Sequence, residues 1–224
     1  MNIQSSSAPG SEPSATQVAY MELRQMILTG ALPAGEKLKI ERLRNLLGTG
    51  ASPVREALSL LTSDMLVERI DQRGFRAAPA NLKNFQEILS LRCTMEDMAL
   101  RQSIALATPA WEEALVLAHH RMQRTNRKED VRGFEDAHKE FHMQVLANAD
   151  APVLLRYCSQ LYDLNIRYRY LAAEGVDYKK RDTAAEHRDI LDAAVTGDAD
   201  GAATALFEHY RRTGDYLEET LRTL

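Results

Sequence analysis

The sequence has few of the features that mark secreted, disulfide-linked or membrane-embedded proteins. Its two cysteines, Cys93 and Cys158, stand far apart and have no CxxC partner. This pattern argues against a disulfide framework or a thiolate zinc site and favours two reduced, buried thiols. No stretch approaches the roughly 18 consecutive apolar residues of a membrane-spanning helix, and residues 1–15 lack the basic and apolar regions of a signal peptide. We therefore expect a cytoplasmic protein without a membrane partner.

The chain also lacks a strong net charge. Its formal charge is -4, with 27% charged and 45% hydrophobic residues, which is typical of a soluble globular protein. Residues 1–80 hold 9 Lys+Arg against 8 Asp+Glu, whereas residues 81–224 hold 19 against 24. Because affinity for phosphates needs local positive charge, a nucleic-acid partner would meet the first part of the chain.

The first part of the chain alternates short helical and extended patterns. Serine, proline and glycine crowd residues 1–15, which predicts a disordered tail because such a segment buries little apolar surface. Apolar residues at helical spacing predict a helix over residues 18–28. Pro33 and Gly35 then favour a turn before a short strand at residues 37–40.

Two further helices are predicted around a glycine turn. The run IERLRNLLG indicates a helix over residues 40–48 that ends at Gly48. The next helix would span residues 52–61, with Ser52 as its N-cap and Pro53 in the first helical position, where a missing N–H is harmless. Two helices joined in this way are typical of a helix-turn-helix.

A small hairpin completes the first domain, which we place at residues 16–79. MLVERI and FRAA are short extended runs on either side of a turn that contains Gly74. This order of elements predicts a winged helix-turn-helix, whose recognition helix, here residues 52–61, enters the major groove of double-stranded DNA. A merely charged, solvated surface is the alternative for the basic residues. The residues expected to contact DNA are Lys39, Arg42, Arg44, Ser52, Arg55, Arg73, Gly74 and Arg76.

The pattern changes after Asn81 to long helical stretches. Breaks such as Thr108-Pro109 and Gly197-Asp198 separate them, and no strand pattern appears. We predict that residues 80–224 form an all-α bundle of six to seven helices, so the chain as a whole is mostly α.

Four of the six histidines are spaced so that they can meet. In HKEFH, His138 and His142 lie one helical turn apart on the same helix face. His187 and His209 lie at similar distances before and after the Gly197 break, so two antiparallel helices would bring them to the same height. Converging imidazoles suit Zn, Ni, Cu or Fe, whereas the alternative is four ordinary hydrogen-bonded histidines.

A hydrolytic metal site is not expected. In an HExxH zinc enzyme a glutamate activates the bound water, but Glu140 stands two residues from each histidine and so about 200° around the helix. No GxSxG, P-loop or GxGxxG pattern is present either. We therefore expect no enzyme. A metal-dependent small-molecule binding protein or hydrolase without a DNA role stays open as the alternative.

Several motifs together carry a family resemblance. The first domain resembles the N-terminal domain of the GntR superfamily of bacterial transcription regulators, through the runs ILTGALPAGEKL, LRNLLG, SPVREAL and RGFR. The helical part resembles the FadR-type (FCD) branch of this superfamily. Together the resemblance covers about residues 17–220. GASPVREAL with DLNIRYRY resembles the subgroup that includes the glutarate-responsive repressor of carbon-starvation genes. One departure is Ala51, which replaces an arginine that reads bases in many relatives.

The resemblance implies a metal-dependent effector site. FCD domains bind a metal through an Asp or Asn and three histidines, so His138 takes the place of the acidic ligand and leaves the site more positive. Zn is the first expected metal. A small carboxylate or dicarboxylate effector would then occupy the vacant metal positions and an arginine.

Arg92 is the first candidate for this arginine, and Arg167 and Arg169 are weaker ones. The alternative for Arg92 is an ion pair with Glu96 at i+4. We further expect a homodimer that acts as a repressor on a two-fold related DNA operator.

Overall fold

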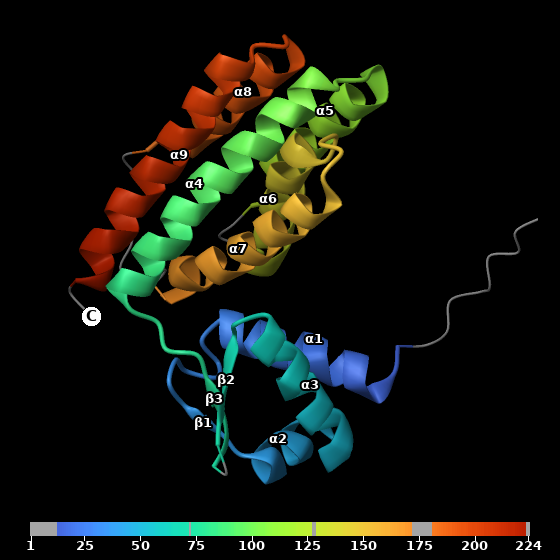
Figure 1. Ribbon diagram of the computed structural model, residues 1–224, viewed down its shortest axis with the longest axis vertical. Coiled ribbons are helices and arrows are strands. Elements are labelled where there is room, and N and C mark those ends of the chain that lie inside the picture. The colour runs from blue at the N-terminus through green and yellow to red at the C-terminus, as the bar shows by residue number, and fades with distance from the viewer. Residues whose placement is uncertain (1–12, 72, 127–128, 172–180, 223–224) are drawn as a thin grey trace, which may run out of the picture. The chain divides into compact units, whose positions relative to one another are not determined.

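The structure is a computed structural model that describes residues 13–71, 73–126, 129–171 and 181–222 (Figure 1). The chain divides into two compact units, one that ends at Pro79 and one that begins at Ala80. The tail predicted for residues 1–15 lies mostly outside the described residues. Its last residue is already helical, because Ser14 and Gln17 form a capping box at the start of the first helix.

The first unit combines three helices with a small sheet. The strands pair antiparallel in the order β1-β3-β2, with Lys37 opposite Arg76 and Ile70 opposite Gly74. This arrangement is the predicted winged helix-turn-helix, in which β2 and β3 form the wing. The elements are α1 (Ala15–Leu28), β1 (Lys37–Leu38), α2 (Ile40–Leu47), α3 (Ala51–Ser63), β2 (Val67–Ile70) and β3 (Gly74–Ala77).

The core of the first unit forms where α1 packs on α3. Leu23 and Ile27 from α1 and Leu58 and Leu61 from α3 are fully buried there. Burial of each such side chain contributes roughly 1.5–3 kcal/mol relative to its exposure to water. The sheet is too small to supply a core of its own, so this helix pair positions α3 and the wing.

The turn between α2 and α3 corrects one sequence prediction. Gly48 ends α2 in the left-handed conformation, with φ of 62°, as the sequence indicated. The N-cap of α3 is Gly50, however, and not Ser52. The backbone turns from extended to helical at Gly50, so Ser52 lies inside the first turn and its hydroxyl donates to Glu56 Oε1 over 3.1 Å.

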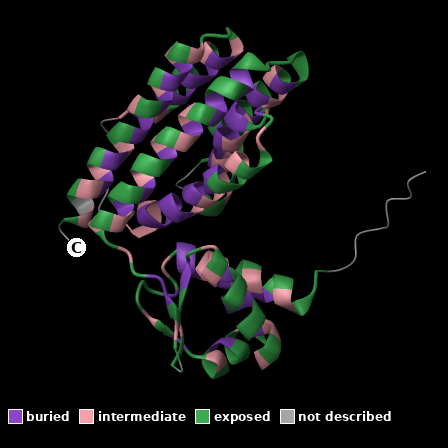
Figure 2. Ribbon diagram, viewed as in Figure 1, coloured by how far each residue is buried: buried purple, intermediate pink, exposed green. Residues whose placement is uncertain are grey.

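The second unit contains six helices within its described residues, which agrees with the lower of the expected numbers. Helix α4 packs against α7 and α9, while α5 packs against α6 and α8 (Figure 1). Buried residues lie on the helix faces that turn toward one another (Figure 2). The helices are α4 (Leu82–Ala105), α5 (Pro109–Arg124), α6 (Val131–Leu146), α7 (Pro152–Leu171), α8 (Thr183–Val195) and α9 (Ala199–Leu221).

Local sequence signals set the limits of these helices. Asn81, Thr108 and Asp182 each accept a backbone N–H from the first turn of the helix that follows. Gly197, with φ of 76°, allows the tight reversal between α8 and α9. Among the described helices, none is long and apolar enough to cross a membrane.

We predict that Gly48→Ala destabilises the protein by about 1 kcal/mol, because a side chain strains the left-handed backbone. No atom lies within 4 Å of the added Cβ, so a clash would not contribute. Gly48→Asn is the control and should lose less stability, since asparagine tolerates this conformation. Urea unfolding followed by circular dichroism measures both, and equal losses would contradict the backbone explanation.

Candidate metal centre

Four histidines converge in the centre of the second unit. His138 and His142 come from α6, His187 from α8 and His209 from α9. One ring nitrogen from each lies within 4.8 Å of the others, and all four residues are buried. The one-turn spacing on α6 and the reversal at Gly197 bring these side chains together, so the structure assembles the set that the sequence singled out.

The four rings do not form a regular cage. The ring centroids of His138 and His142 lie 4.5 Å apart, as do those of His187 and His209. Those of His138 and His209 are 6.3 Å apart. Three of the four rings, those of His138, His187 and His209, line the cavity described below, so the cluster faces that cavity.

Hydrogen bonds fix the orientation of two of the rings. His209 Nδ1 lies 2.9 Å from Glu186 Oε2, and His142 Nδ1 lies 2.9 Å from the Tyr210 hydroxyl. The Tyr210 hydroxyl donates its hydrogen to Glu96, so it accepts the Nδ1–H of His142. In both histidines the Nε2 lone pair then faces the cluster. Partners of this kind commonly orient metal-binding histidines.

The cluster also leaves buried nitrogens without partners. Nε2 of His142 and Nε2 of His187 are buried and have no hydrogen-bond partner. A buried polar atom in this state costs about 1–3 kcal/mol, which a metal bond would offset. The residues present therefore fit a divalent transition metal.

The protonation state of the four imidazoles suits metal binding as well. Burial is the largest cause that lowers the pKa of each ring, and the pKa of His209 falls to about 4. The positive charge of Arg169 adds to this effect on the pKa of His138. Only a neutral imidazole can bind a metal, so all four rings are in the binding form at neutral pH.

A cavity of about 210 Å³ opens beside the cluster. Its walls carry two guanidinium groups, and each is held by a buried carboxylate. Arg169 Nη2 donates to Glu135 Oε1 over 3.0 Å, and Arg181 Nε donates to Glu186 Oε1 over 2.7 Å. Two guanidiniums in a small cavity suit an anion. The lining residues are Phe134, His138, Arg169, Arg181, Thr183, His187, His209 and Thr213.

Of the three arginines that the sequence suggested as effector ligands, one lines the cavity and two do not. Arg92 Nε lies 2.7 Å from Glu96 Oε1, and its Nη1 donates to Asn165 over 3.0 Å, so it forms the buried ion pair considered as its alternative role. The residues that line the cavity include Arg169 but neither Arg92 nor Arg167. Sequence analysis missed Arg181, since no pattern links it to histidines on α6 and α9.

Glu140 is turned away from the histidines. Its carboxylate forms an exposed ion pair with Arg121 Nη1 at 2.8 Å. This position agrees with the expectation from the spacing in HKEFH, and it leaves Glu140 unable to activate a water molecule at the cluster.

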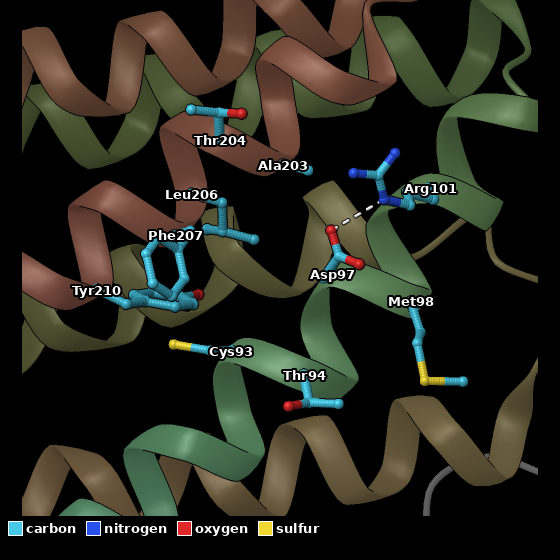
Figure 3. A pocket seen from close by; sticks show the side chains of 10 residues that line it. All are labelled: Cys93, Thr94, Asp97, Met98, Arg101, Ala203, Thr204, Leu206, Phe207 and Tyr210. Carbon is cyan, nitrogen blue, oxygen red and sulfur yellow. Dashed lines mark hydrogen bonds and ion pairs between the residues drawn. The ribbon is translucent and has the colours of Figure 1, made fainter.

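A second cavity, of about 490 Å³, lies between α4 and α9 (Figure 3). Its wall includes Cys93, Met98 and Phe207, and Figure 3 shows the Asp97–Arg101 ion pair at its edge. Its chemistry differs from that of the histidine cluster, because its lining holds an apolar face and an already paired charge.

The residues expected to contact DNA are exposed in the first unit. Lys39 precedes α2, Arg42 and Arg44 lie on α2, and Arg55 lies on α3. Arg42 pairs with Glu36, and Arg44 pairs with Glu41 at 3.2 Å. Arg73, Gly74 and Arg76 lie on the wing, where Gly74 has φ of 94°.

We predict that the metal-free protein loses stability as the pH falls from about 6.5 toward about 4. The unfolded chain takes up protons below about pH 6.5, whereas the folded histidines stay neutral until lower pH. The stabilisation is therefore present above pH 6.5 and lost toward the folded pKa. Each histidine adds up to about 1.4 kcal/mol per pH unit.

Urea unfolding at several pH values measures this dependence. His187→Gln should reduce the slope, and His120→Gln, an exposed histidine outside the cluster, is the matched control. An unchanged slope in His187→Gln would contradict the assignment of the pH dependence to the cluster.

The comparisons with protein families cover both units. Residues 15–76 match the family described as bacterial regulatory proteins, gntR family. Residues 87–212 match the FCD domain. Each match falls within one of the two structural units.

Individual relatives give the same result. The chain is 33% identical over 203 residues to the HTH-type transcriptional regulator BphR of Paraburkholderia xenovorans, covering 88% of this chain and 82% of that protein. It is 30% identical over 119 residues to the HTH-type transcriptional repressor GlaR of Escherichia coli, covering 51% of this chain and 54% of that protein. Both relatives are named as regulators, which agrees with the expectation that the protein is not an enzyme.

Solved structures share the fold. The structure of E. coli McbR/YncC has a TM-score of 0.80 at 22% identity and covers 93% of this chain and 99% of its own. A GntR transcriptional regulator from Rhodococcus sp. RHA1 has a TM-score of 0.72 at 18% identity, covering 91% of this chain and 96% of its own. Together with the family matches, this shows that the chain belongs to the GntR family of DNA-binding bacterial transcription regulators and carries an FCD domain.

Proposed function

We propose that this regulator is a repressor whose affinity for its DNA operator is controlled by a small carboxylate bound beside a metal ion in the FCD domain. The observation that carries the proposal is the buried four-histidine cluster, with unpartnered Nε2 atoms on His142 and His187, next to a cavity that holds two guanidiniums. A sensor needs both parts, because the cluster alone does not select a ligand.

The metal would be held by His138, His142, His187 and His209. Neutral imidazoles favour zinc, our first candidate, and also suit nickel, iron or copper. When bound, the ion supplies a positive charge that attracts an anionic oxygen. Glu186 and Tyr210 would keep His209 and His142 in the orientation that metal binding requires.

The effector would be a small carboxylate or dicarboxylate. A guanidinium can bind a carboxylate through two parallel hydrogen bonds, and both Arg169 and Arg181 line the cavity. A volume of about 210 Å³ restricts the ligand to a few carbon atoms. Glutarate is the first compound to test, because the sequence resembles the glutarate-responsive subgroup and GlaR is named as a repressor. Arg92 and Arg167, outside this lining, would act indirectly.

DNA would be bound by the first unit. Helix α3, with Arg55 in its first turns, would enter the major groove, and the wing with Arg73 and Arg76 would lie near the phosphate backbone. A homodimer would place two such helices on a two-fold related operator in the cytoplasm. The effector must bind one DNA-binding state of this dimer more tightly than the other in order to change operator affinity.

We expect about one transition metal ion per purified chain, and a loss of this metal in His142→Ala and in His187→Ala, because each removes a buried ligand nitrogen. Elemental analysis by mass spectrometry measures the content after gel filtration. His120→Ala is the matched control, since it removes an exposed histidine outside the cluster. A metal-free wild-type protein, even after reconstitution, would refute the sensor site.

We expect Arg55→Ala to weaken operator binding by about 1–3 kcal/mol if Arg55 contacts a base edge. If Arg55 contacts a phosphate instead, binding should weaken on all sequences and the salt slope should fall by about 1. Fluorescence anisotropy with operator and random DNA at several salt concentrations separates these results. An unchanged affinity in Arg55→Ala would remove Arg55 from the DNA interface, whereas a wild-type protein that does not distinguish operator from random DNA would favour a metal-dependent binding protein without a DNA role.

A further inference from the structure

Two of the four histidines lie beside a guanidinium, but in different ways. Arg181 Nη2 lies 3.3 Å from Nδ1 of His209, whereas Arg169 lies close to both ring nitrogens of His138. Nη1 of Arg169 lies 3.2 Å from both ring nitrogens of His138, and Nδ1 of His138 also lies 2.5 Å from the Tyr162 hydroxyl. A guanidinium carries only donors, so it needs the ring nitrogen that has a lone pair. A neutral imidazole has one such nitrogen and one N–H, and the two contacts must be divided between them.

One division satisfies both contacts. If Nδ1–H donates to the Tyr162 hydroxyl oxygen, Nε2 keeps the lone pair and accepts from Arg169. In the other tautomer, with the hydrogen on Nε2, the guanidinium and the hydroxyl would both have to donate to the one lone pair on Nδ1. With this tautomer the guanidinium competes with a metal for the Nε2 lone pair of His138, whereas Nε2 of His142 and of His187 has no hydrogen-bond partner.

Arg169 is anchored so that it can exchange partners. Its Nη2 donates to the buried Glu135 carboxylate, while its Nη1 group faces His138. Both Arg169 and His138 line the cavity of about 210 Å³. An anion in this cavity is thus within reach of the same guanidinium that contacts His138, and a carboxylate is a stronger acceptor for a guanidinium than a neutral imidazole is.

We propose that Arg169 controls whether His138 serves as a metal ligand. Without an anion in the cavity, the guanidinium holds His138 and the metal is bound by His142, His187 and His209. An anionic ligand draws Arg169 away, and His138 becomes the fourth ligand. This inference rests on the proposed function, because it assigns a regulatory step to the same metal centre.

The proposal implies that metal and anion strengthen each other's binding. A carboxylate that releases His138 increases the affinity for the metal, and by linkage the metal increases the affinity for the carboxylate by the same factor. Arg169 also places a positive charge near the metal, which would weaken metal binding without any role for His138. The experiment must therefore separate exchange of the His138 ligand from simple charge repulsion.

A double-mutant cycle makes this separation. We would titrate Co²⁺ into the full-length metal-free protein, with and without glutarate, and follow the visible absorption of Co²⁺, which changes with coordination number. The proteins are wild type, Arg169→Gln, His138→Gln and the combination of the two. Arg121→Gln is the matched control, because it removes an exposed guanidinium that pairs with Glu140 on α6.

Without glutarate, we expect Arg169→Gln to raise the affinity for Co²⁺ about tenfold or more. Its absorption should shift toward that of the wild type with glutarate. Added glutarate should then no longer change the Co²⁺ affinity of this variant. The same substitution in the His138→Gln background should give little gain, and Arg121→Gln should match the wild type. An equal gain in both backgrounds would show charge repulsion alone and overturn the proposal, as would no gain in the single variant.

Two further outcomes are distinguishable. If the wild type binds no Co²⁺, the proposed metal sensor itself fails, whereas normal binding without a coupling between Arg169 and His138 refutes only this inference. Should Arg169→Gln fail to fold, Glu135→Gln combined with Arg169→Gln removes the buried carboxylate that would be left without its partner. This double variant is then compared with and without His138→Gln, and thermal unfolding checks that each protein is folded.

Discussion

The FCD domain depends on one constraint, which is the burial of four neutral imidazoles around a common point. Imidazoles deprived of water need partners for their ring nitrogens, and for three of the four histidines one partner is Tyr162, Tyr210 or Glu186. On the inner side, Nε2 of His142 and Nε2 of His187 have no partner, so the same packing that orients the rings creates a demand for a metal.

The outer partners connect the cluster to distant helices. His142 contacts Tyr210, whose hydroxyl donates to Glu96, and Glu96 pairs with Arg92, which donates to Asn165 on α7. This buried chain joins α6, α9, α4 and α7. Loss of a single member would leave a buried charge or donor without a partner, which typically destabilises a protein by several kcal/mol. The network thus ties the geometry of the histidine cluster to α4, the first helix after the DNA-binding unit.

Much of this architecture could be predicted from the sequence, because it follows from short-range patterns. Helical periodicity, Gly48 and the hairpin glycine gave the winged helix-turn-helix, and the position of the Gly197 turn placed His187 opposite His209. Features that depend on packing between helices could not be predicted. Arg181 carries no sequence signal, and the spacing alone did not decide between a ligand contact and the ion pair with Glu96 for Arg92. The N-cap of α3, a local feature, lies at Gly50 and not at the predicted Ser52.

The central claim is that buried histidine nitrogens bind a metal and that the cluster stays open toward the cavity. X-ray absorption spectroscopy of the zinc-loaded protein tests it most directly, since imidazoles give a recognisable scattering pattern around the ion. The account predicts at least three imidazole nitrogens at about 2.0–2.1 Å, together with an oxygen ligand that changes when glutarate is added. A closed shell of four imidazoles that glutarate does not alter, or a shell without imidazoles, would contradict it.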